Sequence, residues 1–214
     1  KGQYSPTSET GKQTPSTPWG SIDPPINPLT VALAAEASFV ARAVDVDKNL
    51  PEVLERAAAH KGSAFVEIYQ DCNVFNHKAF EHATDKQTKE DNILRLEHGK
   101  PIVFGNDRDK GIRMNGHTPE VVSLSNGVSE DDLLFHDETD ANLAYILAQM
   151  HHPEMPEPTG VLHCENQARY EDILEKQIAD AKQQRGEPSL DDLFNAGDTY
   201  TIEPTGDNDA MQDH

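Results

Sequence analysis

Residues 39–69 carry the pattern of two short apolar strands separated by an amphipathic helix. The runs 39–44 and 63–69 are mostly apolar and are bounded by turn residues, as buried strands are. Between them, apolar positions recur at helical spacing, and Gly62 ends this segment. Asn49, followed three residues later by Glu52, predicts a capping box at the start of the helix. A strand, a helix and a strand in this order predict a βαβ unit, and therefore an α/β fold with a parallel sheet.

The first 28 residues differ in composition from the segment that follows. Six prolines and three glycines exclude a long helix or a central strand there. Trp19, Ile22 and Ile26 are interleaved with them, and disordered linkers rarely carry such anchoring side chains. We therefore expect an ordered loop, followed by a helix rich in Ala and Leu at 29–37.

The rest of the chain reads as an irregular α+β extension with two longer helices. Residues 77–138 are polar and contain only short apolar islands, at 93–96, 102–104 and 121–122. Amphipathic helices are predicted at 139–150 and at about 168–184. Three prolines break the chain between them, before the apolar pair at 161–162. Ser189, with Asp192 three residues later, is expected to cap a last short helix.

Composition narrows the possible partners. The chain has 214 residues, 38 Asp and Glu against 18 Lys and Arg, and a net charge of −20, which argues against nucleic acid or an anionic membrane as its main partner. No apolar run approaches the roughly 20 residues of a membrane span. Two cysteines cannot form a disulfide framework, which fits a cytoplasmic location. The acidity has two explanations that stay open: adaptation to high salt, or solvated loops with an acidic tail.

Two segments could carry chemistry on their own residues. Cys72 lies just past the second predicted strand, at the edge where parallel sheets form their sites, although a lone cysteine is more often a small buried apolar residue and cannot hold a metal cluster alone. Residues 1–8 combine a lysine, a glycine, a Ser-Pro turn and several hydroxyls. Such a loop is either an anion-binding loop or a surface turn.

Three stretches together resemble a known family. Lys1-Gly-Gln-Tyr-Ser-Pro-Thr-Ser8, Thr17-Pro-Trp-Gly-Ser-Ile-Asp-Pro-Pro-Ile-Asn-Pro28 and Phe65-Val-Glu-Ile-Tyr-Gln-Asp-Cys-Asn-Val-Phe-Asn76 resemble the β subunit of 2-oxoacid:ferredoxin oxidoreductases, most closely the 2-oxoglutarate type. The resemblance is dense over residues 1–76 and weaker through the extension. It returns at 158–162 and 169–174.

The resemblance implies a fold, cofactors and partners. Residues 1–76 would be the C-terminal half of a parallel-sheet thiamine-diphosphate-binding domain, 77–150 the C-terminal extension of the β subunit, and 151–214 a helical segment with an acidic tail. The family binds thiamine diphosphate, Mg²⁺ and one 4Fe–4S cluster. It oxidises a 2-oxoacid to acyl-coenzyme A and CO2, passes the electrons to ferredoxin, and pairs this subunit with an α subunit or a fused αγ chain.

The same resemblance assigns roles to individual residues. Cys72 matches the last ligand of the 4Fe–4S cluster. Lys1 matches a lysine beside the thiazolium ring that is expected to pair with the substrate carboxylate, and Gly2 and Gln3 would line the same loop near thiamine diphosphate. Lys48 matches a second lysine near the substrate or the coenzyme A channel.

Two family features are absent from this chain. Neither the Gly-Asp-Gly…Asn motif that holds Mg²⁺ and the diphosphate nor the other three cluster cysteines occurs in it. We therefore expect the C-terminal part of the subunit, which alone would bind neither thiamine diphosphate nor a complete cluster. Two alternatives stay open: a thiamine-dependent decarboxylase without iron, and an acidic interaction module without catalysis.

Overall fold

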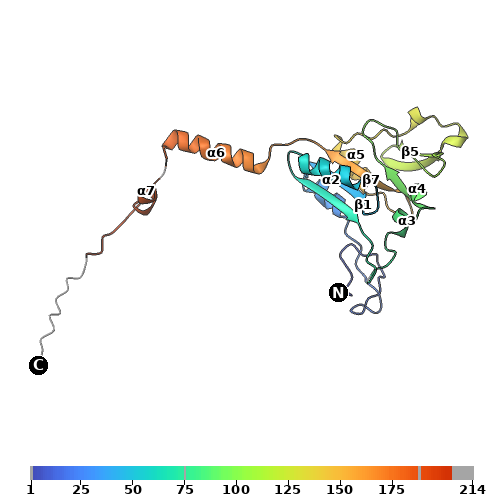
Figure 1. The fold of residues 1–214 in the computed structure, drawn as a ribbon, viewed down its shortest axis with the longest axis horizontal. Helices are drawn as coiled ribbons and strands as arrows, with labels where there is room; N and C mark the ends of the chain where they lie inside the picture. The colour runs from blue at the N-terminus through green and yellow to red at the C-terminus, as the bar shows by residue number, and fades with distance from the viewer. Residues whose placement is uncertain (1, 75, 188, 204–214) are drawn as a thin grey trace, which may run out of the picture. The chain divides into compact units, whose positions relative to one another are not determined.

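A four-stranded mixed sheet with the strand order β2-β1-β7-β3 organises the first of two units in the chain, residues 1–169, and the second unit comprises residues 170–214 (Figure 1). The computed structural model describes residues 2–74, 76–187 and 189–203. The elements are α1 (Pro28–Ala34), β1 (Phe39–Val44), α2 (Leu50–Ala59), β2 (Ala64–Tyr69), α3 (Glu81–Thr84), α4 (Lys89–Asn92), β3 (Ile93–Arg95), β4 (Val103–Phe104), β5 (Lys110–Asn115), β6 (Thr118–Ser123), the 3-10 turns η1 (Leu124–Asn126) and η2 (Glu130–Asp132), α5 (Ala141–Ala148), β7 (Glu157–Cys164), α6 (Tyr170–Arg185) and α7 (Leu190–Phe194).

The predicted βαβ unit is confirmed. β1 pairs with β2 in parallel, with Phe39 opposite Ala64, and α2 connects the two strands. The predicted capping box at the start of α2 is wrong, because Asn49 makes no side-chain capping bond. Its backbone is already helical (φ −83°, ψ −10°), whereas a capping side chain needs an extended backbone to reach the free N–H groups.

β7 is longer than the apolar pair at 161–162 predicts. It pairs in parallel with β3 over residues 157–159 and antiparallel with β1 from Gly160 to Cys164. Pro158 lies in the part of β7 that pairs only with β3. Because this part does not pair with β1, the missing N–H of Pro158 costs no hydrogen bond to β1. The sheet is therefore mixed, with a parallel pair on each side of an antiparallel one.

The side chains of β1 alternate between two helical layers. Val40 packs in the main core with α1 and α5, while Phe39 and Ala41 pack with Val53 of α2 on the other face. Every residue of β1 is buried. Helices thus cover both faces of the sheet, as the α/β prediction requires.

The extension is built as short elements around a second sheet. β4, β5 and β6 form this antiparallel sheet, and the predicted apolar islands fall on β3, β4 and β6. The helix predicted at 139–150 is α5. In the second unit, Ser189 Oγ accepts a hydrogen bond from the Asp192 N–H (3.0 Å), which confirms the predicted cap.

A buried charged network ties three strands together. Arg42 of β1 is 1% exposed, and its Nε donates to Glu67 Oε2 of β2 (2.8 Å). Glu157 of β7 bonds to His82 Nε2 (3.1 Å) and accepts the His152 N–H (3.3 Å). Burial alone would raise the pKa of Glu157, but the hydrogen bond from His82 and the charge of Arg42 hold it below its usual value.

We predict that Gly160→Ala destabilises the fold by about 2–3 kcal/mol. Gly160 has φ +103°, and an added Cβ would lie 3.0 Å from the carbonyl oxygen of Leu96. Gly116→Ala is the matched control, since Gly116 also has positive φ (+63°) but has no atom within 4 Å of the added Cβ. Urea unfolding measures both variants. Equal losses would show that the close approach at Gly160 does not matter.

We also predict a pH-dependent cost for Glu157→Gln. The pKa of Glu157 is lower in the folded chain than its unfolded value of 4.5, so its stabilisation is complete above about pH 4.5 and is lost as the pH falls through the folded value. The variant should lose about 2–3 kcal/mol at pH 7, and its difference from the unmodified chain should shrink below pH 4.5. Glu55→Gln, at an exposed position of α2, should change little. A pH-independent difference would contradict the charged network.

Candidate functional site

The carboxyl edge of β1 and β2 brings the sequence-predicted segments together. The two strands are parallel, so the turn after β1, which carries Lys48, and the loop after β2, which carries Cys72, leave the sheet at the same edge. Parallel α/β sheets bind their ligands at this edge. The site is therefore built from loops that the pairing of two strands positions.

The N-terminal loop, residues 2–27, is held by hydrogen bonds rather than by apolar anchors. The Gly11 N–H donates to the Ser21 carbonyl (2.8 Å), and the Ser21 N–H donates back to the Lys12 carbonyl (3.0 Å). The expectation that Trp19 and Ile22 anchor this loop is wrong, because they are 96% and 89% exposed. The apolar composition correctly predicts a defined loop but not the way in which it is stabilised.

The N-terminal loop contacts the loop that carries Cys72. Lys12 Nζ donates to Asn76 Oδ1 and also bonds to Glu9 Oε1 (3.0 Å). Beside this contact lies a cavity of about 300 Å³, lined by Gly2 and Gln3 on one side and by Asn76 on the other. Two of the three stretches that carry the family resemblance are thus adjacent.

Lys1 lies outside the described residues. The sequence pattern does not predict a role for Lys12. The one sequence feature that could have pointed to it is its position directly after a glycine in the N-terminal loop.

Cys72 lies on a short closed loop at this edge. The Asn76 N–H donates to the Cys72 carbonyl (3.0 Å), and Asp71 Oδ2 bonds to His77 Nδ1 (3.0 Å), so both ends of the loop are held. The Cys72 side chain is exposed. An exposed thiol on a fixed loop fits one ligand position of an iron–sulfur cluster.

Cys164 cannot share a cluster with Cys72. It lies opposite Phe39 at the amino end of β1, and the six residues of β1 span about 17 Å. Burial raises the pKa of the Cys164 thiol, and the carboxylate of Glu138 acts in the same direction. Over the ranges that the structure describes, no three His, Cys, Asp or Glu side chains form a metal-binding group. The chain thus offers a single cysteine at the carboxyl edge.

The turn that carries Lys48 is fixed by its neighbour in the sequence. Asp47 Oδ2 pairs with Arg95 Nη1 of β3, and Asp47 Oδ1 accepts the Asn49 N–H (3.4 Å). Burial alone would raise the pKa of Asp47, but the hydrogen bond and the charge of Arg95 lower it overall, so the carboxylate stays ionised. Lys48 itself is exposed. A rigid turn with an exposed ammonium group is suited to contact an anionic ligand.

A second cavity, of about 400 Å³, lies against the buried network. It is lined by Arg42, Glu67 and Phe80 from the body of the unit and by Ile26 from the N-terminal loop. Arg42 Nη1 is buried there and makes no hydrogen bond among the described residues. Sequence reasoning missed Arg42, and the signal for it was an arginine inside an otherwise apolar strand.

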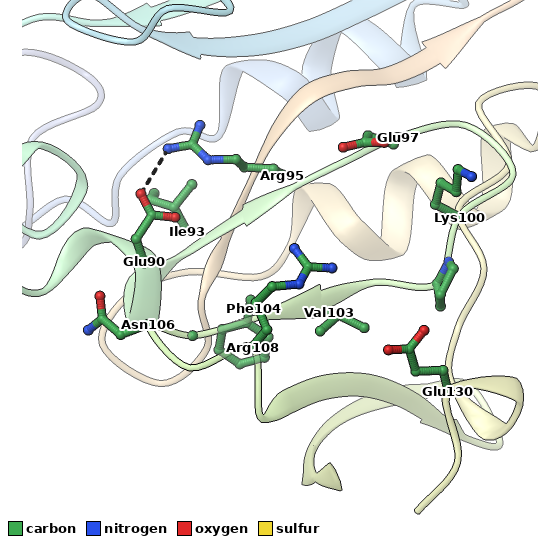
Figure 2. Close-up of a pocket in the computed structure, with 12 residues that line it drawn as sticks. Glu90, Ile93, Arg95, Glu97, Lys100, Val103, Phe104, Asn106, Arg108 and Glu130 are labelled. Atoms are coloured by element: carbon green, nitrogen blue, oxygen red, sulfur yellow. Dashed lines mark hydrogen bonds and ion pairs between the residues drawn. The ribbon is translucent and has the colours of Figure 1, made fainter.

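A third cavity, of about 600 Å³, lies in the extension and is shown in Figure 2. Charged side chains of both signs surround it, and Arg95 Nη2 bonds there to Glu90 Oε1 (3.2 Å). None of the sequence-predicted site residues lines it. The carboxyl edge of β1 and β2 therefore remains the candidate site. In the described ranges, no helix has the length and apolar character that crossing a membrane requires.

The chain is similar to a known protein family and to individual known proteins. Residues 1–68 match the family described as thiamine pyrophosphate enzyme, C-terminal TPP binding domain. The chain is 39% identical over 209 residues to 2-oxoglutarate oxidoreductase subunit KorB of Mycobacterium tuberculosis, covering 95% of this chain and 56% of that protein. It is 40% identical over 77 residues to a 2-oxoacid:ferredoxin oxidoreductase subunit beta of Saccharolobus solfataricus, covering 36% of this chain and 25% of that protein.

A solved structure shares the fold. The 2-oxoglutarate:ferredoxin oxidoreductase from Magnetococcus marinus, with 2-oxoglutarate, coenzyme A and succinyl-CoA bound, matches with a TM-score of 0.57 and 25% identity, over 91% of this chain and 51% of that one. The chain spans about half the length of the M. tuberculosis and M. marinus proteins. The α/β fold and the predicted resemblance to 2-oxoacid:ferredoxin oxidoreductase β subunits are confirmed over the part of those proteins that the chain spans.

Proposed function

We propose that this chain is part of an enzyme that oxidatively decarboxylates a 2-oxoacid, 2-oxoglutarate, to acyl-coenzyme A and CO2 and passes the electrons through a 4Fe–4S cluster to ferredoxin. One observation carries the proposal. In a chain whose residues 1–68 match a thiamine-diphosphate domain, the loop with Gly2 and Gln3 adjoins the loop with Cys72 at the carboxyl edge of the sheet. The choice of 2-oxoglutarate is supported by the names of two relatives.

The residues of this chain would hold and orient the cofactor. Bound thiamine diphosphate, with its Mg²⁺, supplies the stabilisation of negative charge that decarboxylation of a 2-oxoacid needs. Gly2 and Gln3 would line its site, and the contact between Lys12 and Asn76 would fix the loop against the sheet. Lys1 would pair with the substrate carboxylate, and Lys48 would contact the substrate or coenzyme A as a point charge.

Cys72 would supply one thiolate of the cluster. Its exposed position after β2 leaves room for iron and for ligands that this chain does not contain. The neighbouring backbone N–H groups of Asn73 and Val74 would tune the reduction potential of a bound cluster. When bound, the cluster would supply one-electron transfer chemistry, and Cys72 would be one of the residues that hold it.

Exposed apolar side chains near the site support an assembly with further protein. Trp19, Ile22 and Val74 are at least 78% exposed, and tryptophan side chains such as Trp19 commonly anchor interfaces. We assign the covering surface to the remainder of the enzyme, including an α subunit or a fused αγ chain, in the cytoplasm. A decarboxylase without iron and a non-catalytic acidic module are not favoured, because the relatives are named as oxidoreductases.

We predict that Cys72→Ser in the complete enzyme removes the EPR signal of the reduced cluster and the reduction of ferredoxin, because a serine hydroxyl is a poor replacement for a cluster thiolate. Cys164→Ser is the matched control. It lies at the opposite edge of the sheet and should leave the signal in place. An unchanged signal in Cys72→Ser would refute the ligand assignment.

We predict that Lys48→Ala raises the KM for 2-oxoglutarate or for coenzyme A about tenfold and changes kcat little, since a charge contact of about 1.4 kcal/mol is lost from binding. Lys61→Ala removes an exposed lysine from the other end of α2, at the opposite edge, and should leave both constants unchanged. Steady-state kinetics, with each substrate varied in turn, measures KM and kcat for both variants. Unchanged KM values for both substrates would show that Lys48 is only a solvated surface residue.

A further inference from the structure

The second unit of the chain carries an apolar stripe on α6 that none of the described residues of that unit covers. Tyr170, Ile173, Leu174 and Ile178 follow the spacing of one helix face on α6 and are between 37% and 75% exposed. None of the described residues from 170 to 203 is buried. A 16-residue helix is marginal in water without tertiary packing, so a stripe of this kind calls for a surface to pack on.

The apolar character continues past α6. Large apolar side chains recur on α7 and in the segment after it, and all of them are between 68% and 86% exposed. These residues are Leu190, Leu193, Phe194, Tyr200 and Ile202. Residues 170–203 contain nine large apolar residues among 34. Disordered tails are depleted in such residues, so this segment is not merely a solvated tail.

The charge of the segment limits which protein surface it can pack on. Residues 170–203 hold nine acidic and three basic residues, and the part from 186 onward has five acidic residues and no basic one. A second copy of this chain, with a net charge of −20, would repel such a segment. Charge complementarity therefore favours a different protein, one whose apolar groove is bordered by Lys and Arg.

The segment also occurs in a homologous protein that is itself named as a subunit of an enzyme. The alignment with the M. tuberculosis protein covers 209 of the 214 residues, so it includes nearly all of the second unit. The match to the S. solfataricus protein covers only 77 residues. The segment is thus retained in a relative that is itself named as a subunit.

We propose that residues 170–203 are a docking arm by which this chain binds the α subunit, or the fused αγ chain, of its oxidoreductase. The stripe on α6 lies in an apolar groove of that partner, and the acidic residues of the arm meet basic residues at the rim of the groove. The identity of the partner rests on the proposed function, whereas the existence of an unburied acidic and apolar arm does not.

The test compares two double variants of the full-length protein, each co-expressed with the partner subunit. L174E/I178E places two carboxylates in the stripe, and A179E/Q183E adds the same charge on the opposite face of the same helix. We expect L174E/I178E to weaken the subunit complex at least tenfold, because buried Leu and Ile side chains each contribute about that much to binding. A179E/Q183E should bind within about twofold of the unmodified protein. The unmodified complex should also weaken as salt screens the acidic flank.

Measurements of affinity and of thermal unfolding distinguish failure of the docking arm from failure of the proposed function. The affinity of the purified subunits is measured by mass photometry or calorimetry, and thermal unfolding of the isolated protein should be the same for both variants, since all four positions are exposed. A complex that is equally tight in L174E/I178E overturns the docking arm alone. No complex even with the unmodified protein overturns both the arm and the proposed function. Self-association of the isolated protein that L174E/I178E abolishes would show that a second copy is the occupant, and would also overturn the proposal.

Discussion

The parallel pairing of β1 with β2 determines where the candidate functional residues of this chain lie. Since the two strands run in the same direction, the turn with Lys48 and the loop with Cys72 leave the sheet at one edge. The N-terminal loop reaches this edge through the contact of Lys12 with Asn76. β7 pairs antiparallel on the other side of β1, which places Cys164 at the far edge. One strand pairing thus separates a cysteine that can serve a cluster from one that packs beside the core.

β1 also carries a buried charged residue, Arg42, which limits how the strand can pair with its neighbours. Arg42 sits in a strand that is buried along its whole length, and it is compensated by Glu67 of β2, with Glu157 of β7 nearby. Buried ion pairs contribute little net stability but tolerate few alternative geometries, because an unpaired buried charge is costly. A register that left the buried Arg42 guanidinium without Glu67 would therefore be disfavoured. Arg42 also borders a cavity that the N-terminal loop helps to line.

The sequence predicts the βαβ unit well because its signals are local. The period of the apolar positions, the lengths of the segments and the single glycine at 62 suffice to predict β1, α2 and β2. The C-terminal part of β7, up to Cys164, agrees with the sequence. Its start is missed because Pro158 and Gly160 interrupt the apolar run, and its pairing with two different strands depends on tertiary structure. The exposure of Trp19 is missed for a related reason: composition indicates that a loop carries apolar side chains, but not which of them the fold leaves exposed. Arg42 could be noticed but not interpreted without the partners that the fold brings to it.

The candidate site itself is predicted less by physics than by resemblance. The position of a lone cysteine after a strand is a weak signal by itself, and only the family motifs assigned Cys72 the role of a cluster ligand before the fold placed it at the carboxyl edge. The most direct measurement of the central claim is anomalous diffraction at the iron edge from crystals of the complete enzyme. The account predicts an iron peak within bonding distance of Cys72 Sγ, next to the loop that holds Asn76. An iron cluster bound elsewhere, with no peak beside Cys72, would contradict it.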